Sequence, residues 1–219
     1  MSSSPPQIVV RGQAVLVADP EVADVGVTVR ARARDRQVAL ERCAALQESV
    51  TRVLEAAGDA VEEIDTAAVS VSVERRRDGS PGEAVASVTT RLTIGRLDAA
   101  GEVVVALGRQ DGVDLWGPNW RLRRDSPVFE RARLAALEDA VRRARGYARA
   151  FGAELAALLS VSDEGLSGSS ARFAAPAEAM ASFGSDELRL DLAPARQEVH
   201  GAVEVRFAMS EPDQEVFRR

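Results

Sequence analysis

The sequence predicts an α+β fold in which antiparallel hairpins form sheets packed against a few helices, one of them long and rich in Ala. Three observations support this prediction. Several Val-rich segments alternate apolar and polar residues with the period of a strand. Other segments repeat apolar residues every three or four positions, as helices do. Short runs rich in Gly, Pro and Asp separate these segments.

The chain begins with a predicted hairpin and a helix. Residues 7–17 and 22–33 are rich in Val and alternate apolar with polar side chains. A turn separates them, which predicts two paired strands. Residues 35–57 then place their apolar side chains on one helical face. Asp35 is suited to cap this helix and Gly58 to end it.

A second hairpin is predicted next, with a charged tip between its strands at 69–73 and 84–94. A short helix follows over 98–107. The segment 113–123, which holds both tryptophans, is predicted to be extended.

The long helix is predicted to begin at Ser126 and Pro127, a capping hydroxyl followed by the residue favoured at the first helical position, and to end near Gly152. Strands at 155–162 and 199–209 complete the chain. The buried face of the long helix is expected to contain Phe129, Ala136, Leu137, Ala140, Ala144, Ala148 and Phe151.

We expect one domain over residues 8–209. The stretch 163–197 is rich in Ser, Gly, Ala and Pro and lacks periodicity, which predicts a long loop within that domain. A disordered N-terminus at 1–7 and a tail at 210–219 are expected to flank it.

The composition excludes several kinds of reactive site. The chain has no Lys, one His and one Cys. It therefore has no P-loop or Schiff-base lysine and no residues for a Cys/His zinc site or an internal disulfide. His200 and paired acids such as Glu62 and Glu63 belong to no recognisable catalytic pattern. We expect a protein that is not an enzyme, with no catalytic residues, no cofactor and no metal.

A basic stripe is expected on the long helix, where four arginines project at similar angles opposite the apolar face. A solvated face with Glu138 and Arg142 paired explains this stripe, and so does a site for an anion or a partner. The stripe consists of Arg131, Arg142, Arg145 and Arg149.

Both tryptophans lie in one five-residue segment of a chain that is only 4% aromatic. They are expected to anchor the core or an interface. The segment Gly165 to Leu192 of the long loop is the other expected contact region. The candidate interface residues are Trp116, Trp120, Phe173, Met180 and Phe183.

The net charge of −6 argues against a nucleic acid as the main partner. We expect no membrane span, because no segment is long and apolar enough. The N-terminal residues do not read as a signal peptide, so a cytoplasmic location is expected.

Five blocks of the sequence, in order, resemble the SIMPL-domain family. They are Val10-Arg11-Gly12 with the turn Pro20-Glu21, the helix end at 53–58, the segment Ile64-Asp65-Thr66, the Ala-rich helix at 132–152 and the strand at 203–207. The resemblance extends from Ile8 to Met209.

The resemblance implies an α+β domain with helices backing the sheets. Family members are commonly periplasmic or associated with the cell envelope, and some build ring-like or channel-like homo-oligomers. Roles suggested for relatives include protection against oxidative stress and association with a signalling kinase. We therefore expect a self-assembling, non-enzymatic interaction domain with an unknown protein partner. The alternative is a small-ligand or anion-binding module that uses the arginine stripe.

Overall fold

The computed structural model describes residues 5–75, 81–163 and 190–218. Their contacts divide the chain into two units. Among the described residues, unit 1 consists of 5–18, 124–163 and 197–218, and unit 2 of 19–75, 81–123 and 190–196. A single domain over 8–209 stays a prediction.

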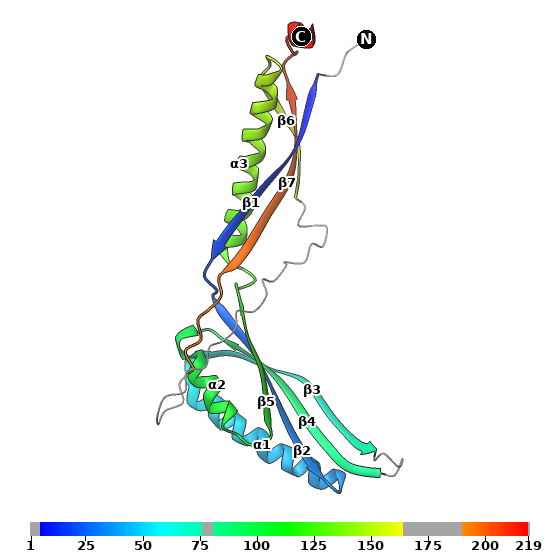
Figure 1. Cartoon of the computed structure of the whole chain (residues 1–219), viewed down its shortest axis with the longest axis vertical. Helices are drawn as coiled ribbons and strands as arrows, with labels where there is room; N and C mark the ends of the chain where they lie inside the picture. Colours follow the sequence, from blue (N-terminus) through cyan, green and yellow to red (C-terminus); the bar gives the residue numbers. More distant parts are fainter. Residues whose placement is uncertain (1–4, 76–80, 164–189, 219) are drawn as a thin grey trace. The chain divides into compact units, whose positions relative to one another are not determined.

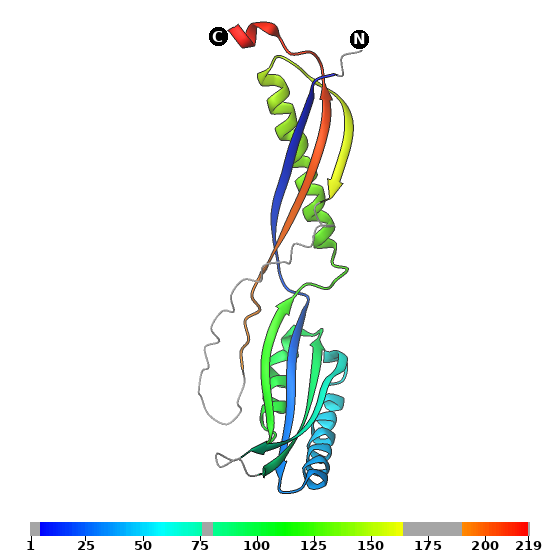
Figure 2. The same cartoon turned by 90° about the vertical axis from the view of Figure 1, so that its right-hand side faces the viewer.

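Unit 1 is a three-stranded antiparallel sheet with one long helix on one face (Figures 1 and 2). The strand order is β1-β7-β6, so β7 is central and the other two strands form the edges. The strands are β1 (Gln7–Ala18), β6 (Leu155–Asp163) and β7 (Gln197–Met209), and the helix is α3 (Pro127–Ala150). A short 3-10 turn at Gln214–Arg218 ends the described chain.

Helix α3 begins and packs largely as its sequence predicts. The Ser126 hydroxyl accepts a hydrogen bond from the Val128 N–H at 3.3 Å, and Pro127 follows this cap. Phe151 was expected on the buried face but is 38% exposed, because it lies at the C-cap beyond the last turn. It stacks on Phe217 instead. The buried residues of the helix are Val128, Ala132, Ala136, Ala140, Ala144 and Ala148.

The alanine face brings α3 unusually close to the sheet. A Cβ atom built on Gly12 of β1 would lie 2.7 Å from both N and Cβ of Ala140. A Cβ atom on Gly201 of β7 would meet the backbone of Ala132 and lie 3.1 Å from the Arg133 nitrogen. Small residues on both surfaces therefore permit direct contact between helix backbone and strands.

Unit 2 is a four-stranded antiparallel sheet with two helices (Figure 1). Its strand order is β3-β4-β2-β5. The strands are β2 (Val22–Ala33), β3 (Val61–Arg75), β4 (Pro81–Ile94) and β5 (Val113–Arg121). The helices are α1 (Arg36–Ala57) and α2 (Ala100–Gly108), with 3-10 turns at Gly58–Ala60 and Leu97–Ala99.

The caps expected for α1 are confirmed. Asp35 accepts hydrogen bonds from the N–H groups of Gln37, at 2.7 Å, and Val38, at 3.4 Å. Gly58 ends the helix with φ of 57°, a value that favours glycine. The helix buries Ala39, Cys43, Val50 and Leu54 within the core of unit 2.

The predicted first hairpin is wrong, although both of its strands exist. β1 pairs with β7, whereas β2 pairs with β4 and β5 in the other unit. The turn after Ala18 therefore carries the chain from one sheet to the other. The second hairpin is confirmed by the pairing of β3 with β4, which brings Val69 opposite Val88.

Candidate functional site

The histidine and the cysteine, residues often used in catalysis, do not come together with other reactive groups in the part of the chain that the structure describes. His200 is 60% exposed on β7, and its nearest ionic neighbour is the Glu198 carboxylate at 3.9 Å. Cys43 is buried in unit 2, and burial raises the pKa of its thiol. Within the described ranges, no three residues of the types His, Cys, Asp and Glu are grouped to hold a metal ion.

Two acidic residues of unit 2, Glu62 and Asp24, are held in close ion pairs with arginines. Arg123 donates to both carboxylate oxygens of Glu62, at 2.6 and 2.7 Å, and this hydrogen bonding lowers the pKa of Glu62. Arg121 Nε donates to Asp24 Oδ2 at 2.6 Å, and the Thr93 hydroxyl donates to the other oxygen at 3.2 Å. This geometry is that of a structural network that joins strands β5, β2 and β4.

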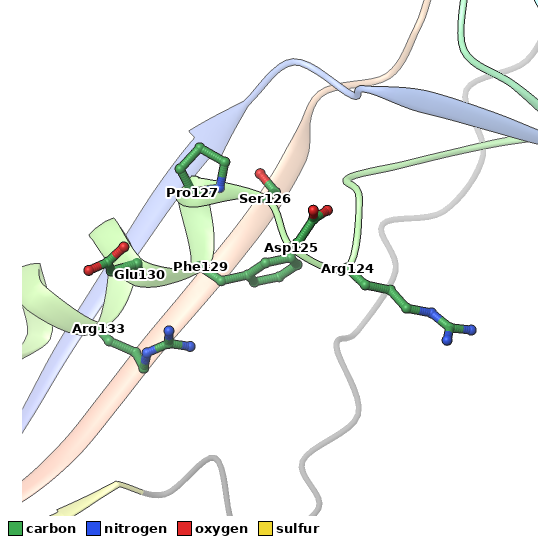
Figure 3. Close-up of a pocket in the computed structure, with 7 residues that line it drawn as sticks. All are labelled: Arg124, Asp125, Ser126, Pro127, Phe129, Glu130 and Arg133. Carbon is green, nitrogen blue, oxygen red and sulfur yellow. The ribbon is translucent and has the colours of Figure 1, made fainter. Parts of the chain in front are cut away.

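A shallow hollow of about 340 Å³ lies where α3 begins (Figure 3). Arg124 and Arg133 extend on opposite sides of the Phe129 ring, and the carboxyl groups of Asp125 and Glu130 point in different directions. The two basic and two acidic side chains around the hollow have no common focus. It offers no arrangement for acid and base catalysis.

A larger groove, of about 680 Å³, lies between α3 and β6. It exists because α3 packs on β1 and β7 and hardly contacts β6, which Figure 2 shows at the edge of the sheet. Phe207 of β7 is on the lining, and Leu158 of β6 is 59% exposed beside it. The described residues that line the groove are Val141, Arg145, Ala148, Arg149, Ala153, Glu154, Leu155, Ala156, Ala157, Leu158 and Phe207.

The four arginines of the predicted stripe differ in their surroundings. Arg142 forms an ion pair with Asp139, so the expected pairing of Arg142 with Glu138 is wrong. Asp139 is three residues from Arg142 on the same helix face and is mostly buried, which makes it the better placed acid. Arg131 is exposed away from the groove. Arg145 and Arg149 line the groove.

The two edges of the unit 1 sheet differ. Along β1, the backbone N–H of Gln13 donates to Asp139 Oδ2 at 3.1 Å, and Arg143 Nη1 donates to the carbonyl of Arg11 at 2.6 Å. Two side chains of α3 therefore occupy hydrogen-bonding groups at this edge. Over residues 155–162 of β6, no described strand and no side chain of α3 does the same along the outer edge.

The two tryptophans of β5 have different surroundings. Trp116 lies over Gly26 of β2, so closely that a Cβ atom there would overlap its indole, and it is 47% exposed. Trp120 is partly buried against the core of unit 2. The other candidate interface residues, Phe173, Met180 and Phe183, lie outside the described residues.

Sequence reasoning identified the arginines of the groove but missed its apolar lining. Leu155 and Leu158 were assigned to a strand, and Phe207 to another. These residues line one groove because α3 covers β1 and β7 but leaves β6 largely uncovered. No local sequence pattern encodes the position of the helix over the sheet. A weak sequence signal for an apolar groove wall was present in β6, whose first five residues are all apolar and do not alternate with polar ones.

None of the described helices combines the length and the apolarity that crossing a membrane requires. A family model named SIMPL, described as protein of unknown function, matches residues 8–207. This match covers most of both units. No curated protein matches the chain.

Proposed function

The chain belongs to the SIMPL family, and from its surface we propose that it is a non-enzymatic domain that assembles with copies of itself through the open edge of β6. The observation that carries the proposal is the exposure of this edge strand. Leu158, Leu159 and Val161 are 59%, 45% and 50% exposed. An apolar edge strand favours pairing with a strand of another molecule when, as over residues 155–162, its outer side has no strand partner among the described residues.

The contrast with β1 supports this assignment. Asp139 and Arg143 engage the outer edge of β1 at Gln13 and Arg11, as natural proteins do to prevent strand addition. Residues 155–162 of β6 contain no Pro and no charged side chain, which are the other usual protections. Two edges of one sheet thus differ in their capacity to accept a further strand.

Light scattering coupled to size-exclusion chromatography tests the proposal. We expect the wild-type chain to have a mass of more than one protomer at micromolar concentration. Leu159→Lys should shift the mass toward the monomer, because a charged side chain on an edge strand opposes pairing. A wild-type chain that is monomeric throughout this range would refute self-assembly.

Val15→Lys is the matched control. Val15 is exposed to a similar extent, 54%, on the other edge strand of the same sheet. We expect this variant to keep the wild-type mass. If Val15→Lys dissociates the assembly and Leu159→Lys does not, the contact is formed by β1 and the proposed edge is wrong.

A further inference from the structure

We propose that the groove between α3 and β6 binds a free single-chain anionic amphiphile, a long-chain carboxylate such as a fatty acid. The groove lies within one protomer, so this binding does not require self-assembly. Its volume of about 680 Å³ falls in the range of sites that enclose small organic ligands.

The floor and walls of the groove favour an alkyl chain. Val141 and Ala148 of α3 face Leu155 and Leu158 of β6 across it, and Phe207 of β7 contributes to the lining. Leu158 is 59% exposed, whereas Phe207 is only 7% exposed and Ala148 is 1% exposed. An occupant that lies against Leu158 therefore removes exposed apolar surface from water, which is the main source of affinity for such a ligand, whereas Phe207 and Ala148 add little because they are already covered.

Two guanidinium groups supply the charge that selects an anion. Arg145 and Arg149 are one turn apart on the α3 wall. Arg149 Nε donates to the Arg145 carbonyl at 3.2 Å, and neither side chain has a carboxylate partner among the described residues. Among the described residues Glu154 is the one acid on the lining, so the described charged side chains of the groove sum to +1.

A carboxylate head group fits this charge and geometry. Guanidinium groups bind carboxylates through paired hydrogen bonds, and the binding is stronger beside apolar surface than in open water. The carboxylate would lie at Arg145 and Arg149 and the alkyl chain along Leu155 and Leu158. A small hydrophilic anion would leave the apolar lining unused, and a neutral alkyl compound would leave both arginines unpaired.

Two recessed residues of the lining, Ala148 and Phe207, favour a free amphiphile over a membrane surface. Binding to a bilayer requires apolar side chains that project outward beyond the basic ones. In this groove Ala148 and Phe207 are almost fully covered, and an alkyl chain reaches them only by entering between α3 and β6.

Isothermal titration calorimetry with decanoate and dodecanoate, below their micelle concentrations, tests the proposal. We expect saturable binding at one site per protomer, tightening by about two- to fourfold per added methylene. Acetate should not bind measurably, and 1-decanol should bind at least tenfold more weakly than decanoate. Higher salt should weaken decanoate binding.

The variant Arg145→Gln/Arg149→Gln should weaken dodecanoate binding at least tenfold. Arg131→Gln is the matched control, because Arg131 is exposed on the same helix and lies outside the groove. Leu158→Asn tests the apolar wall. It should weaken dodecanoate binding but leave the preference for a carboxylate over an alcohol unchanged. Thermal unfolding of each variant establishes that it is folded.

Leu159→Lys, which should be monomeric, separates this proposal from self-assembly. If dodecanoate binds neither the wild type nor Leu159→Lys, the groove proposal is wrong whatever the oligomeric state. Equal binding by the Arg145/Arg149 double variant and by Arg131→Gln would also overturn it. Binding to phosphatidylglycerol vesicles without binding to dodecanoate would assign the surface to membranes and refute a free amphiphile as the ligand.

Discussion

The backbone N–H of Gln13 donates a hydrogen bond to Asp139 Oδ2 at 3.1 Å and so joins the edge strand β1 to helix α3. Arg142 and Arg143 lie within ion-pair distance of the same carboxylate. The Gln13 hydrogen bond is the first cause that lowers the pKa of Asp139, and the two arginines add to it. One side chain thereby fixes the helix to the sheet and occupies an edge of that sheet.

Replacing Asp139 by Asn should lower the stability of unit 1 in a way that depends on pH. The folded state favours the ionised carboxylate, so its contribution is present at neutral pH and is lost as the pH falls through the lowered pKa, below about pH 4. Denaturant unfolding from pH 7 to pH 3 should therefore show the largest difference between wild type and variant at pH 7. That difference should shrink in acid.

Glu138→Gln is the control for Asp139→Asn. It removes the neighbouring carboxylate, which is exposed and forms no hydrogen bond with β1 in the described part of the chain. We expect its unfolding curve to follow the wild type at every pH. A wild-type and an Asp139→Asn curve that stay parallel down to pH 3 would contradict the role given to the ionised group.

Gly12→Ala should destabilise the contact between α3 and β1. The added methyl group would lie 2.7 Å from Ala140 and closer to the Ala136 carbonyl, so strand and helix must separate. We expect a loss of about 2–3 kcal/mol in the free energy of unfolding, typical of an overpacked core.

Gly146→Ala is the corresponding control within α3. Gly146 is exposed and nothing lies within 4 Å of an added Cβ atom. This substitution should raise the free energy of unfolding by about 0.5–1 kcal/mol, because Ala favours the helix. If both glycine variants were equally stable, the close packing at Gly12 would not be a constraint on the fold.

The sequence predicted the individual elements well because their signals are local. The cap at Asp35, the stop at Gly58 and the start at Ser126 each depend on a few adjacent residues. Strand partners depend on distant residues instead. The alternation of apolar and polar residues in β1 and β2 carries no information about which strands they pair with. The prediction that β1 pairs with the adjacent strand β2 is therefore wrong, and their partners are β7 and β4.

Only the part of the groove that depends on local sequence signals was predictable. Helical periodicity places Arg145 and Arg149 on one face of α3, and the sequence identified that face. It did not identify Leu158 or Phe207 as their neighbours, because the exposure of β6 follows from the position of α3 over the other two strands. Polar contacts such as the one between Gln13 and Asp139 also join residues too distant for a local pattern.

The two tryptophans should contribute unequally to stability. Trp120 packs against the core of unit 2, so Trp120→Ala should lower the free energy of unfolding by about 3 kcal/mol. Trp116 is 47% exposed over Gly26, and Trp116→Ala should cost about 1 kcal/mol. Chemical unfolding checks both values. A larger loss for Trp116 than for Trp120 would reverse the assignment of the core anchor.

Thr90→Val should stabilise unit 2. Thr90 on β4 is 2% exposed, and its hydroxyl oxygen has no hydrogen-bond partner in the described part of the chain. Replacing the hydroxyl by a methyl group of similar size removes an uncompensated polar atom, so we expect a gain of up to about 1 kcal/mol in the free energy of unfolding.

Thr93→Val is the matched control on the same strand, because the Thr93 hydroxyl donates to Asp24 at 3.2 Å. It should cost about 1–2 kcal/mol, since Asp24 loses a donor. Destabilisation by Thr90→Val as large as that by Thr93→Val would show that the Thr90 hydroxyl is hydrogen-bonded in solution.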